Sequence, residues 1–498
     1  MPTAALPARD RARFRLPRPA LPFLRTELLA GLLVALALIP EAIAFSIIAG
    51  VDPSVGLFAS FVLACSIAIL GGRPAMISAA TGAMALVAAP LVAAHGVGHL
   101  IAATILAGVF QMVLALTGVA KLMRFIPRSV LTGFINALAI LIFMAQIPHF
   151  WGESWVVWTM LGAGLAVIWG LPLLTKAVPA PLVAIVGLSV VTVAFGISVP
   201  NVGDMGDLPS GLPWVALPDV PFTLDTLAVI APYALGLAAV GLLESLMTAK
   251  VVDDATDTRS NKTREAAGQG LGNVLVGFFG GMAGCAMIGQ TMINVKSGAR
   301  SRLSTFSAGL FLLILIVVLG DLVAQIPMAA LVAVMVFVSA VTFDWHSIRP
   351  KTLRRLPISE TIVMVATVAA TVATHNLAIG VGIGVIVAMV AFARKVAHVV
   401  EVTSVTDPEG GSVIYAVTGQ LFFASGNDLV HFFDYDGDPE TVVIDLSDAH
   451  VWDASAVSSL DAIAEKYAKR GKEVEIVGLN RPSADLHGEL SGILNAGH

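Results

Sequence analysis

The chain has 498 residues, of which 57% are hydrophobic and only 13% are charged, and its mean hydropathy is +0.87. A water-soluble protein must cover its surface with charged side chains, so this balance excludes a soluble protein over most of the chain and requires contact with lipid. The net charge of −5 points to no particular partner. No basic stripe is interleaved with aromatic residues, so a nucleic-acid partner is not expected. Cys65 and Cys285 lie far apart in apolar sequence and are interpreted as packing residues, not as a disulfide.

Residues 1–26 form a basic arm with several prolines and six arginines: Arg9, Arg11, Arg13, Arg15, Arg18 and Arg25. The apolar stretch after the arm is too long for a signal peptide and ends in no small-residue cleavage site. We therefore expect a cytoplasmic arm that contacts anionic lipid headgroups.

Residues 27–395 contain fourteen segments that approach the roughly 20 apolar residues a membrane span requires. The first repeat, 27–197, has segments near 27–50, 54–71, 79–95, 99–119, 128–147, 155–174 and 181–197. The second repeat, 227–395, has segments near 227–250, 264–283, 288–299, 303–320, 327–343, 357–374 and 376–393. The third segment of each repeat is unusually short or polar. A proline-containing connection, 198–226, joins the repeats.

The charged residues in the connections between the segments differ between the two sides of the membrane. Lysines and arginines fall only in connections on the side of the N-terminus, whereas the opposite connections carry acidic residues alone: Asp52, Glu153, Asp204, Asp207, Asp219 and Asp321. By the positive-inside rule both termini are cytoplasmic. Each repeat has an odd number of spans, so the two repeats must be inverted relative to each other.

The two short segments are the most informative part of the chain. One follows Ala75–Ser78 and the other follows Ala286–Gly289, and both read as helices that begin inside the membrane. Such helix starts expose unpaired N–H groups and the positive end of a helix dipole, and lipid cannot satisfy them. We predict an anion site between Ser78, Ala79, Ala80 and Thr81 of one helix and Gly289, Gln290 and Thr291 of the other, with the threonine hydroxyls as donors. The alternative is two helix-packing faces made of small residues.

The segment from Gly284 to Thr291 is similar to the motif of a phosphate-binding loop. Gln290, however, occupies the position at which that loop requires lysine, so nucleotide binding is not expected. Two carboxylates, Glu41 and Glu244, occupy corresponding spans of the two repeats. A carboxylate inside the membrane is costly and is a functional candidate by default. Glu244, with Thr248 one turn later, could couple ion binding to transport, and Glu41 with Phe45 could wall the cavity. The alternative for each carboxylate is a structural hydrogen bond to another helix.

Several motifs resemble the SulP family, the prokaryotic relatives of solute-carrier family twenty-six. They are Leu38–Phe45 with Gly56–Ser60, Leu243–Leu246, Arg264-Glu265 with Gly268–Gly270 and Asn273, and Gly280-Gly281 with Asn294–Gly298. The resemblance runs from about Arg25 to the end of the chain. It implies seven-plus-seven inverted repeats divided into a core and a gate domain (the UraA-like fold, which nucleobase carriers share), a substrate between spans three and ten, homodimers and an elevator-type movement.

The sequence departs from the family pattern at Gln290, where many relatives carry arginine. The 284–294 stretch looks closest to the bicarbonate-transporting branch, in which a carboxylate and a threonine of span eight help to hold sodium. Glu244 and Thr248 fit that arrangement, so Na⁺ is the alternative to H⁺ as the coupling ion. No other metal and no cofactor is expected.

Residues 396–498 look like a soluble α/β domain. Strands are expected at Ser412–Thr418, Gln420–Phe423, Thr441–Leu446 and Glu473–Leu479, with a helix over Ala454–Arg470. Asp445–Ser447 and Asp453–Ala456 resemble the signature of a STAS domain. The resemblance places Ser455 where soluble relatives are phosphorylated, although Ser455 could equally cap the helix. The alternative to regulation by phosphorylation is that this domain binds a cytoplasmic protein partner or assists assembly.

Together these observations predict a proton-coupled symporter of a small anion (sulfate, bicarbonate or a small dicarboxylate) in the inner membrane. The alternatives are a sodium-coupled bicarbonate symporter, an uncoupled anion channel or exchanger, a nucleobase carrier, and a regulatory scaffold that acts through its STAS tail. A nucleobase would require stacking and hydrogen-bonding side chains, which Ala79, Ala80 and Gly289 do not supply. The histidines are scattered and no nucleophile–base pair can be proposed, so an enzyme is not expected.

Overall fold

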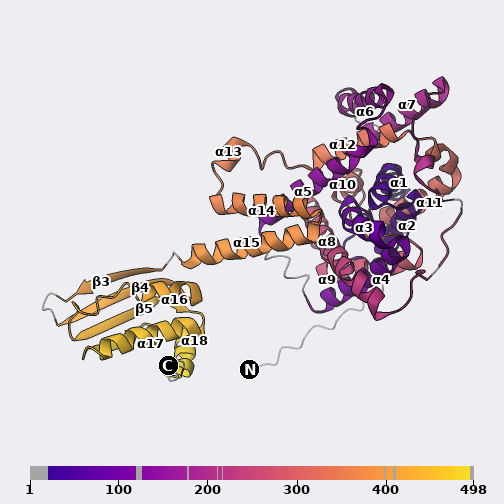
Figure 1. Cartoon of the computed structure of the whole chain (residues 1–498). Helices are drawn as coiled ribbons and strands as arrows, with labels where there is room; N and C mark the ends of the chain where they lie inside the picture. Colours follow the sequence, from indigo (N-terminus) through magenta and orange to yellow (C-terminus); the bar gives the residue numbers. More distant parts are fainter. Residues whose placement is uncertain are drawn as a thin grey trace, which may run out of the picture. The chain divides into compact units, whose positions relative to one another are not determined.

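A computed structural model describes residues 21–118, 126–175, 179–209, 211–215, 217–397, 400–407 and 411–493. Most of the predicted basic arm, and the predicted cytoplasmic lysines and arginine at 121, 124 and 176, lie outside the described residues. The contacts divide the chain into two compact units, 1–384 and 385–498, and the division falls inside helix α15 (Figure 1).

The first repeat forms seven consecutive elements that match the predicted segments. They are α1 (Leu21–Ala49), α2 (Pro53–Leu70), strand β1 (Ser78–Ala80) with α3 (Gly82–His95), α4 (Val97–Leu116), α5 (Arg128–Gln146), α6 (Trp155–Leu174) and α7 (Ala180–Phe195). Pro53 begins α2, and the glycines Gly96 and Gly196 end α3 and α7 at positive φ. Both signals are typical of helix ends, because proline lacks the N–H that a first turn leaves unpaired and glycine tolerates positive φ.

The second repeat matches its predicted segments in the same way. It contains α8 (Leu224–Thr256), α9 (Lys262–Phe278), strand β2 (Gly284–Ala286) with α10 (Ile288–Lys296), α11 (Arg302–Ala324), α12 (Met328–Thr342), α14 (Ile358–Thr374) and α15 (Leu377–Ala397). A one-turn helix, α13 (Pro350–Leu353), lies between α12 and α14. Among the described residues eight helices are long and apolar enough to cross a membrane, and α3, α7, α12 and α14 are shorter apolar helices.

The helices of unit 1 pack in two groups. In one group α1 to α4 pack against α8, α9 and α11, with α10 against α1 and α8. In the other group α5 packs against α12 and α14, and α6 packs against α7 and α12. This grouping corresponds to the predicted core and gate domains. The two broken elements, β1–α3 and β2–α10, both belong to the first group.

The C-terminal unit contains a four-stranded sheet in the order β3-β4-β5-β6. Strand β3 (Glu401–Thr406) runs antiparallel to β4 (Ser412–Leu421), while β5 (Thr441–Val451) and β6 (Glu473–Val477) continue the sheet in parallel. Helices α16 (Phe423–Leu429), α17 (Ala454–Ala468) and α18 (Arg481–Leu490) pack on the sheet or on each other. Leu446, Leu460 and Tyr467 are fully buried in the core of this unit.

Three sequence predictions for this unit need correction. The two predicted strands within 412–423 are one continuous strand, β4, with an irregularity between Ala416 and Thr418. Strand β5 extends five residues beyond the predicted end, to Val451. Ser455 does not cap α17, because the cap is Asp453, whose side chain accepts a hydrogen bond from the Ala456 N–H at 3.0 Å. Ser455 is exposed in the first turn.

Candidate functional site

The two broken helices meet through their extended segments. Strand β1 pairs antiparallel with β2, so that Ser78 lies opposite Ala286 and Ala80 opposite Gly284. The pairing continues through Met287, whose N–H donates to the Ile77 carbonyl at 2.9 Å. Side chains of other helices hold the remaining backbone groups: Asn273 bonds both the N–H and the carbonyl of Gly284, and Ser245 accepts from the Ala286 N–H. The crossing is therefore tightly held by the core.

The N–H groups at the two helix starts are the donors left over from this pairing. Helix α3 begins at Gly82 with Thr81 as its cap, and the Thr81 hydroxyl accepts from the Met84 N–H at 3.4 Å. Helix α10 begins at Ile288 after Met287, which provides no side-chain cap. The first N–H groups of a helix have no partner inside the helix. The groups in question belong to Gly82 and Ala83 in α3 and to Ile288, Gly289 and Gln290 in α10.

All five of those residues line one cavity of about 840 Å³. Besides these five, the cavity brings together four of the predicted site residues: Glu41, Phe45, Thr81 and Glu244. Gly82 allows the Phe45 ring to approach the start of α3, because a Cβ at Gly82 would lie only 2.9 Å from Phe45 Cε1. The other lining residues are largely apolar, so the polar groups of the cavity converge on the two helix starts.

Each carboxylate of the cavity has a polar neighbour from the second repeat. The Gln290 side-chain amide lies beside the Glu41 carboxyl group. The Cys285 thiol donates to Glu244 Oε2 at 2.8 Å, and its sulfur lies 3.1 Å from the Thr81 hydroxyl. Cys285 thus joins the start of α3 to the carboxylate of α8.

Five predicted site residues do not line the cavity: Ser78, Ala79, Ala80, Thr248 and Thr291. All five are buried, and their polar groups bond other parts of the core. The Gln269 side chain donates to the Ser78 hydroxyl, and the Thr291 hydroxyl accepts from the Ile77 N–H at 3.0 Å. The Thr248 hydroxyl donates to its own helix, at the Glu244 carbonyl. These residues position the helix starts, and the first helix begins a few residues later than the sequence suggested.

The cavity extends toward one side of the membrane domain. Beyond the helix starts it is lined by Leu33 in the first half of α1, by Pro181 at the start of α7, by Thr342 at the end of α12, and by Lys296 and Ser297 at the end of α10. In the predicted topology each of these element ends lies on the side of the N-terminus. With that topology, the cavity extends toward the side of the N-terminus.

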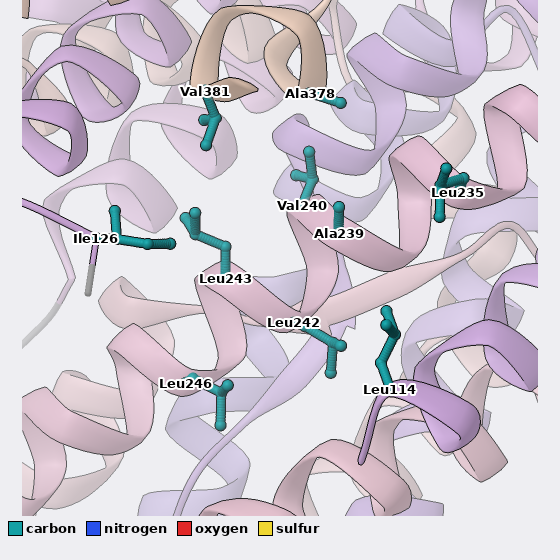
Figure 2. Close-up of a pocket in the computed structure, with 10 residues that line it drawn as sticks. All are labelled: Leu114, Ile126, Leu235, Ala239, Val240, Leu242, Leu243, Leu246, Ala378 and Val381. Carbon is teal, nitrogen blue, oxygen red and sulfur yellow. The ribbon is translucent and has the colours of Figure 1, made fainter. Parts of the chain in front are cut away.

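A second cavity, of about 400 Å³, has a different character (Figure 2). Its ten labelled lining residues come from α4, α8, the start of α15 and the segment before α5, and all are apolar. It presents no donor or charge to an ion. The larger cavity is therefore the candidate anion site.

Comparison with known proteins agrees with this geometry. The model of the sulfate permease family matches residues 24–159 and 154–367, and the STAS domain model matches residues 399–493. The chain belongs to the sulfate permease family. It is a multi-pass membrane protein of a family of anion transporters, and its relatives are named as transporters, not as enzymes.

Among its relatives, the putative sulfate transporter YbaR of Bacillus subtilis is 54% identical over 468 residues, which cover 94% of this chain and 97% of YbaR. The bicarbonate transporter BicA of a Picosynechococcus species is 26% identical, with 91% of this chain and 88% of BicA covered.

Solved structures show the same fold. The transmembrane domain of a cyanobacterial BicA superposes with a TM-score of 0.65 at 27% identity, covering 74% of this chain and 98% of that domain. Murine Slc26a9 superposes with a TM-score of 0.80 at 16% identity, covering 96% of this chain and 89% of Slc26a9, which supports the fold alone.

Cys285 is the functional candidate that the sequence analysis missed, since it was interpreted as a packing residue. Its position directly before the Ala286–Asn294 motif was the available signal, because it places the thiol close to the start of α10. Gln269, whose side chain joins Glu265 to Ser78, was noted only as part of a motif.

Proposed function

We propose that this protein is a proton-coupled symporter of a small anion that works by elevator-type alternating access. The observation that carries the proposal is the convergence of two uncapped or partly capped helix starts on a cavity that also contains two carboxylates. The proposal places both termini in the cytoplasm of a cell with the protein in its inner membrane, and it adopts the homodimer that the family resemblance implies.

The donor set of the cavity fits an anion. The N-terminal ends of α3 and α10 expose unpaired N–H groups and the positive ends of two helix dipoles to the same cavity. Such an arrangement favours the binding of an anion. Gln290 adds a neutral donor. Sulfate, bicarbonate and small dicarboxylates all offer oxygens to such donors, and the names of the relatives favour sulfate or bicarbonate.

Glu244 supplies the coupling in this proposal. Its carboxylate lines the same cavity as the helix starts, and a negative charge there repels an anion through a medium of low dielectric constant. Protonation removes that charge, so that proton and anion binding favour each other. Glu41, beside Gln290, is a second carboxyl group whose charge acts on the same anion.

Hydrogen-bond partners favour the proton over sodium. Sodium is a hard cation that requires several oxygen ligands, whereas the Glu244 carboxylate faces the Cys285 sulfur. The Thr248 hydroxyl donates to the Glu244 carbonyl at 2.8 Å, and Thr248 does not line the cavity that contains the Glu244 carboxylate. Sodium coupling remains the alternative that the experiment below distinguishes.

The packing of the helices in two groups supports an elevator over a fixed channel. The cavity is lined by α1, α3, α8 and α10 of one group and by α5, α7 and α12 of the other. Movement of the first group against the second would carry the helix starts, with their anion, across the membrane.

The STAS domain is proposed to bind a cytoplasmic protein partner. Ser455 is exposed at the start of α17, so a phosphate there would meet the positive end of that helix and would not unfold it. Phosphorylation of Ser455 is thus compatible with a regulatory role.

The test is uptake of labelled sulfate, bicarbonate and fumarate into proteoliposomes under separate proton and sodium gradients. Accumulation of one anion with a proton gradient alone supports the proposal. Accumulation only with a sodium gradient would make sodium the coupling ion. Flux that neither saturates nor follows a gradient would show a channel. No flux and no exchange of any of the three anions would refute the anion assignment.

A further inference from the structure

Helix α10 carries one cation along the wall of the anion cavity. Gly289, Gln290, Ile293 and Lys296 line the cavity at positions that share one face of the helix. Lys296 is exposed in the last turn, seven residues after Gly289. At a rise of 1.5 Å per residue, it lies about 10 Å along the helix from Gly289.

The lysine has no ionic partner in the described part of the chain. The cationic side chains paired near this side of the domain include Lys250 with Asp254 and Lys262 with Asp253, whereas Lys296 forms no ion pair or hydrogen bond with a described residue. The other charged residues of the cavity lining are Glu41 and Glu244, both carboxyl groups deeper in the cavity. Lys296 therefore provides the positive charge of the described cavity wall.

We propose that Lys296 is a charge-selectivity residue at the mouth of the cavity, which favours divalent over monovalent anions. The inference rests on the proposed anion cavity and specifies its substrate class. Gln290 leaves the deep part of the site without a cationic side chain, so the helix starts bind any small oxyanion. Lys296 adds to the described lining a positive charge whose attraction grows with the charge of the anion, and it is placed to act on the anion as it enters.

A through-space interaction scales with the charge of the anion. If loss of the lysine charge weakens binding of a monovalent anion by a given factor, it should weaken binding of a divalent anion by the square of that factor. Over about 10 Å through partly hydrated protein at low salt, we expect factors of about 3 and about 9. Both should shrink as ionic strength rises, because the Debye length falls to about 8 Å at 0.15 M.

A purely structural role predicts something different. A lysine in the last turn stabilises a helix through its dipole. Its loss would then lower thermal stability and affect all anions equally. The ratio between divalent and monovalent affinities separates the two roles, since stability alone does not move it.

The experiment uses the full chain in proteoliposomes with the cytoplasmic side accessible. Equilibrium exchange of a labelled anion, with no ion gradient, is competed with sulfate and with bicarbonate, and the inhibition constants are compared among wild type, Lys296→Gln and Lys296→Arg. Lys250→Gln is the matched control, because Lys250 is ion-paired and lies outside the cavity lining. We expect Lys296→Gln alone to raise the sulfate constant about threefold more than the bicarbonate constant, and Lys296→Arg to restore the ratio.

An unchanged ratio in Lys296→Gln, or the same change in Lys250→Gln, would overturn the inference. Because exchange needs no gradient, failure of proton coupling would leave the selectivity result intact. If the wild type exchanges no labelled anion, protection of the purified protein against heat by sulfate and by nitrate provides the same ratio. Absence of protection by either anion would overturn both the anion cavity and the role of Lys296.

Discussion

Replacing Gly284 with alanine is expected to disrupt the crossing of strands β1 and β2. A Cβ at this position would lie 2.7 Å from Leu63 Cδ2, 2.8 Å from the carbonyl carbon of Ala79, and still closer to the Ala79 oxygen. A backbone carbonyl cannot move aside as a flexible side chain does. Any shift would also strain the two hydrogen bonds between Gly284 and Asn273, at 2.9 and 3.0 Å. Overpacking typically costs about 1–3 kcal/mol, and we expect the upper end here.

Gly289→Ala is the matched control for this prediction. Gly289 also lies next to the anion site, but no atom lies within 4 Å of an added Cβ. Alanine inside a helix is favoured over glycine by about 0.5–1 kcal/mol, so this variant should be at least as stable as wild type. Its methyl group enters the cavity at the start of α10, and we expect KM for the anion to rise about tenfold.

The assay is the thermal midpoint of the purified full chain in detergent, followed by uptake per folded protein. The reasoning predicts a low midpoint with little uptake for Gly284→Ala, and an unchanged midpoint with weakened affinity for Gly289→Ala. It would be refuted by a Gly284→Ala protein as stable and active as wild type. It would equally be refuted by a Gly289→Ala protein that unfolds before Gly284→Ala.

Three further predictions concern coupling and the C-terminal unit. With the membrane potential held at zero, a gradient of two pH units can drive a roughly 100-fold accumulation of the anion per coupled proton. Glu244→Gln should lose this accumulation and keep anion exchange, and retained accumulation would contradict the coupling role. Asp453→Ala removes the α17 cap and should lower the free energy of unfolding of the C-terminal unit by about 1–2 kcal/mol, measured by denaturant titration followed by tryptophan fluorescence, with no loss in an Asp448→Ala control. Burial, and then the hydrogen bond to Asp438, raise the pKa of Tyr467. The protonated hydroxyl therefore contributes fully to the free energy of unfolding below about pH 10, and this contribution is lost as the pH rises further. Tyr467→Phe should make the free energy of unfolding less dependent on alkaline pH, and an unchanged dependence would exclude Tyr467 as its cause.

The membrane elements could be predicted from sequence because lipid leaves the chain few choices. Each apolar segment had to be a helix, and interruptions by small residues had to mark broken helices. The segment predicted near 288–299 was placed accurately, since α10 begins at Ile288. The first start was placed a few residues too early. Ser78–Ala80 are small residues without a strand pattern of their own, and only their pairing with β2 makes them a strand.

The assignment of side chains within the site was less predictable. Thr81 and Thr291 look equivalent in sequence, yet one lines the cavity and the other bonds Ile77 in the core. Periodicity cannot separate them, because the residues lie in broken helices whose orientation depends on contacts with other helices. Strand β3 and helix α18 of the C-terminal unit were not predicted. Both are short and β3 is largely exposed, so neither carries a strong apolar pattern.

The difference between the two helix starts separates anion binding from coupling. At α3, the Thr81 hydroxyl caps the helix and touches Cys285, whose thiol donates to Glu244. At α10, no side chain caps the helix, so its N–H groups remain for the anion. A change at Gly289 should therefore alter affinity with coupling retained, whereas a change at Glu244 should remove coupling with exchange retained. If both variants lost both properties together, proton and anion would share one set of groups, and the separation of coupling at the α3 start from anion binding at the α10 start would be wrong.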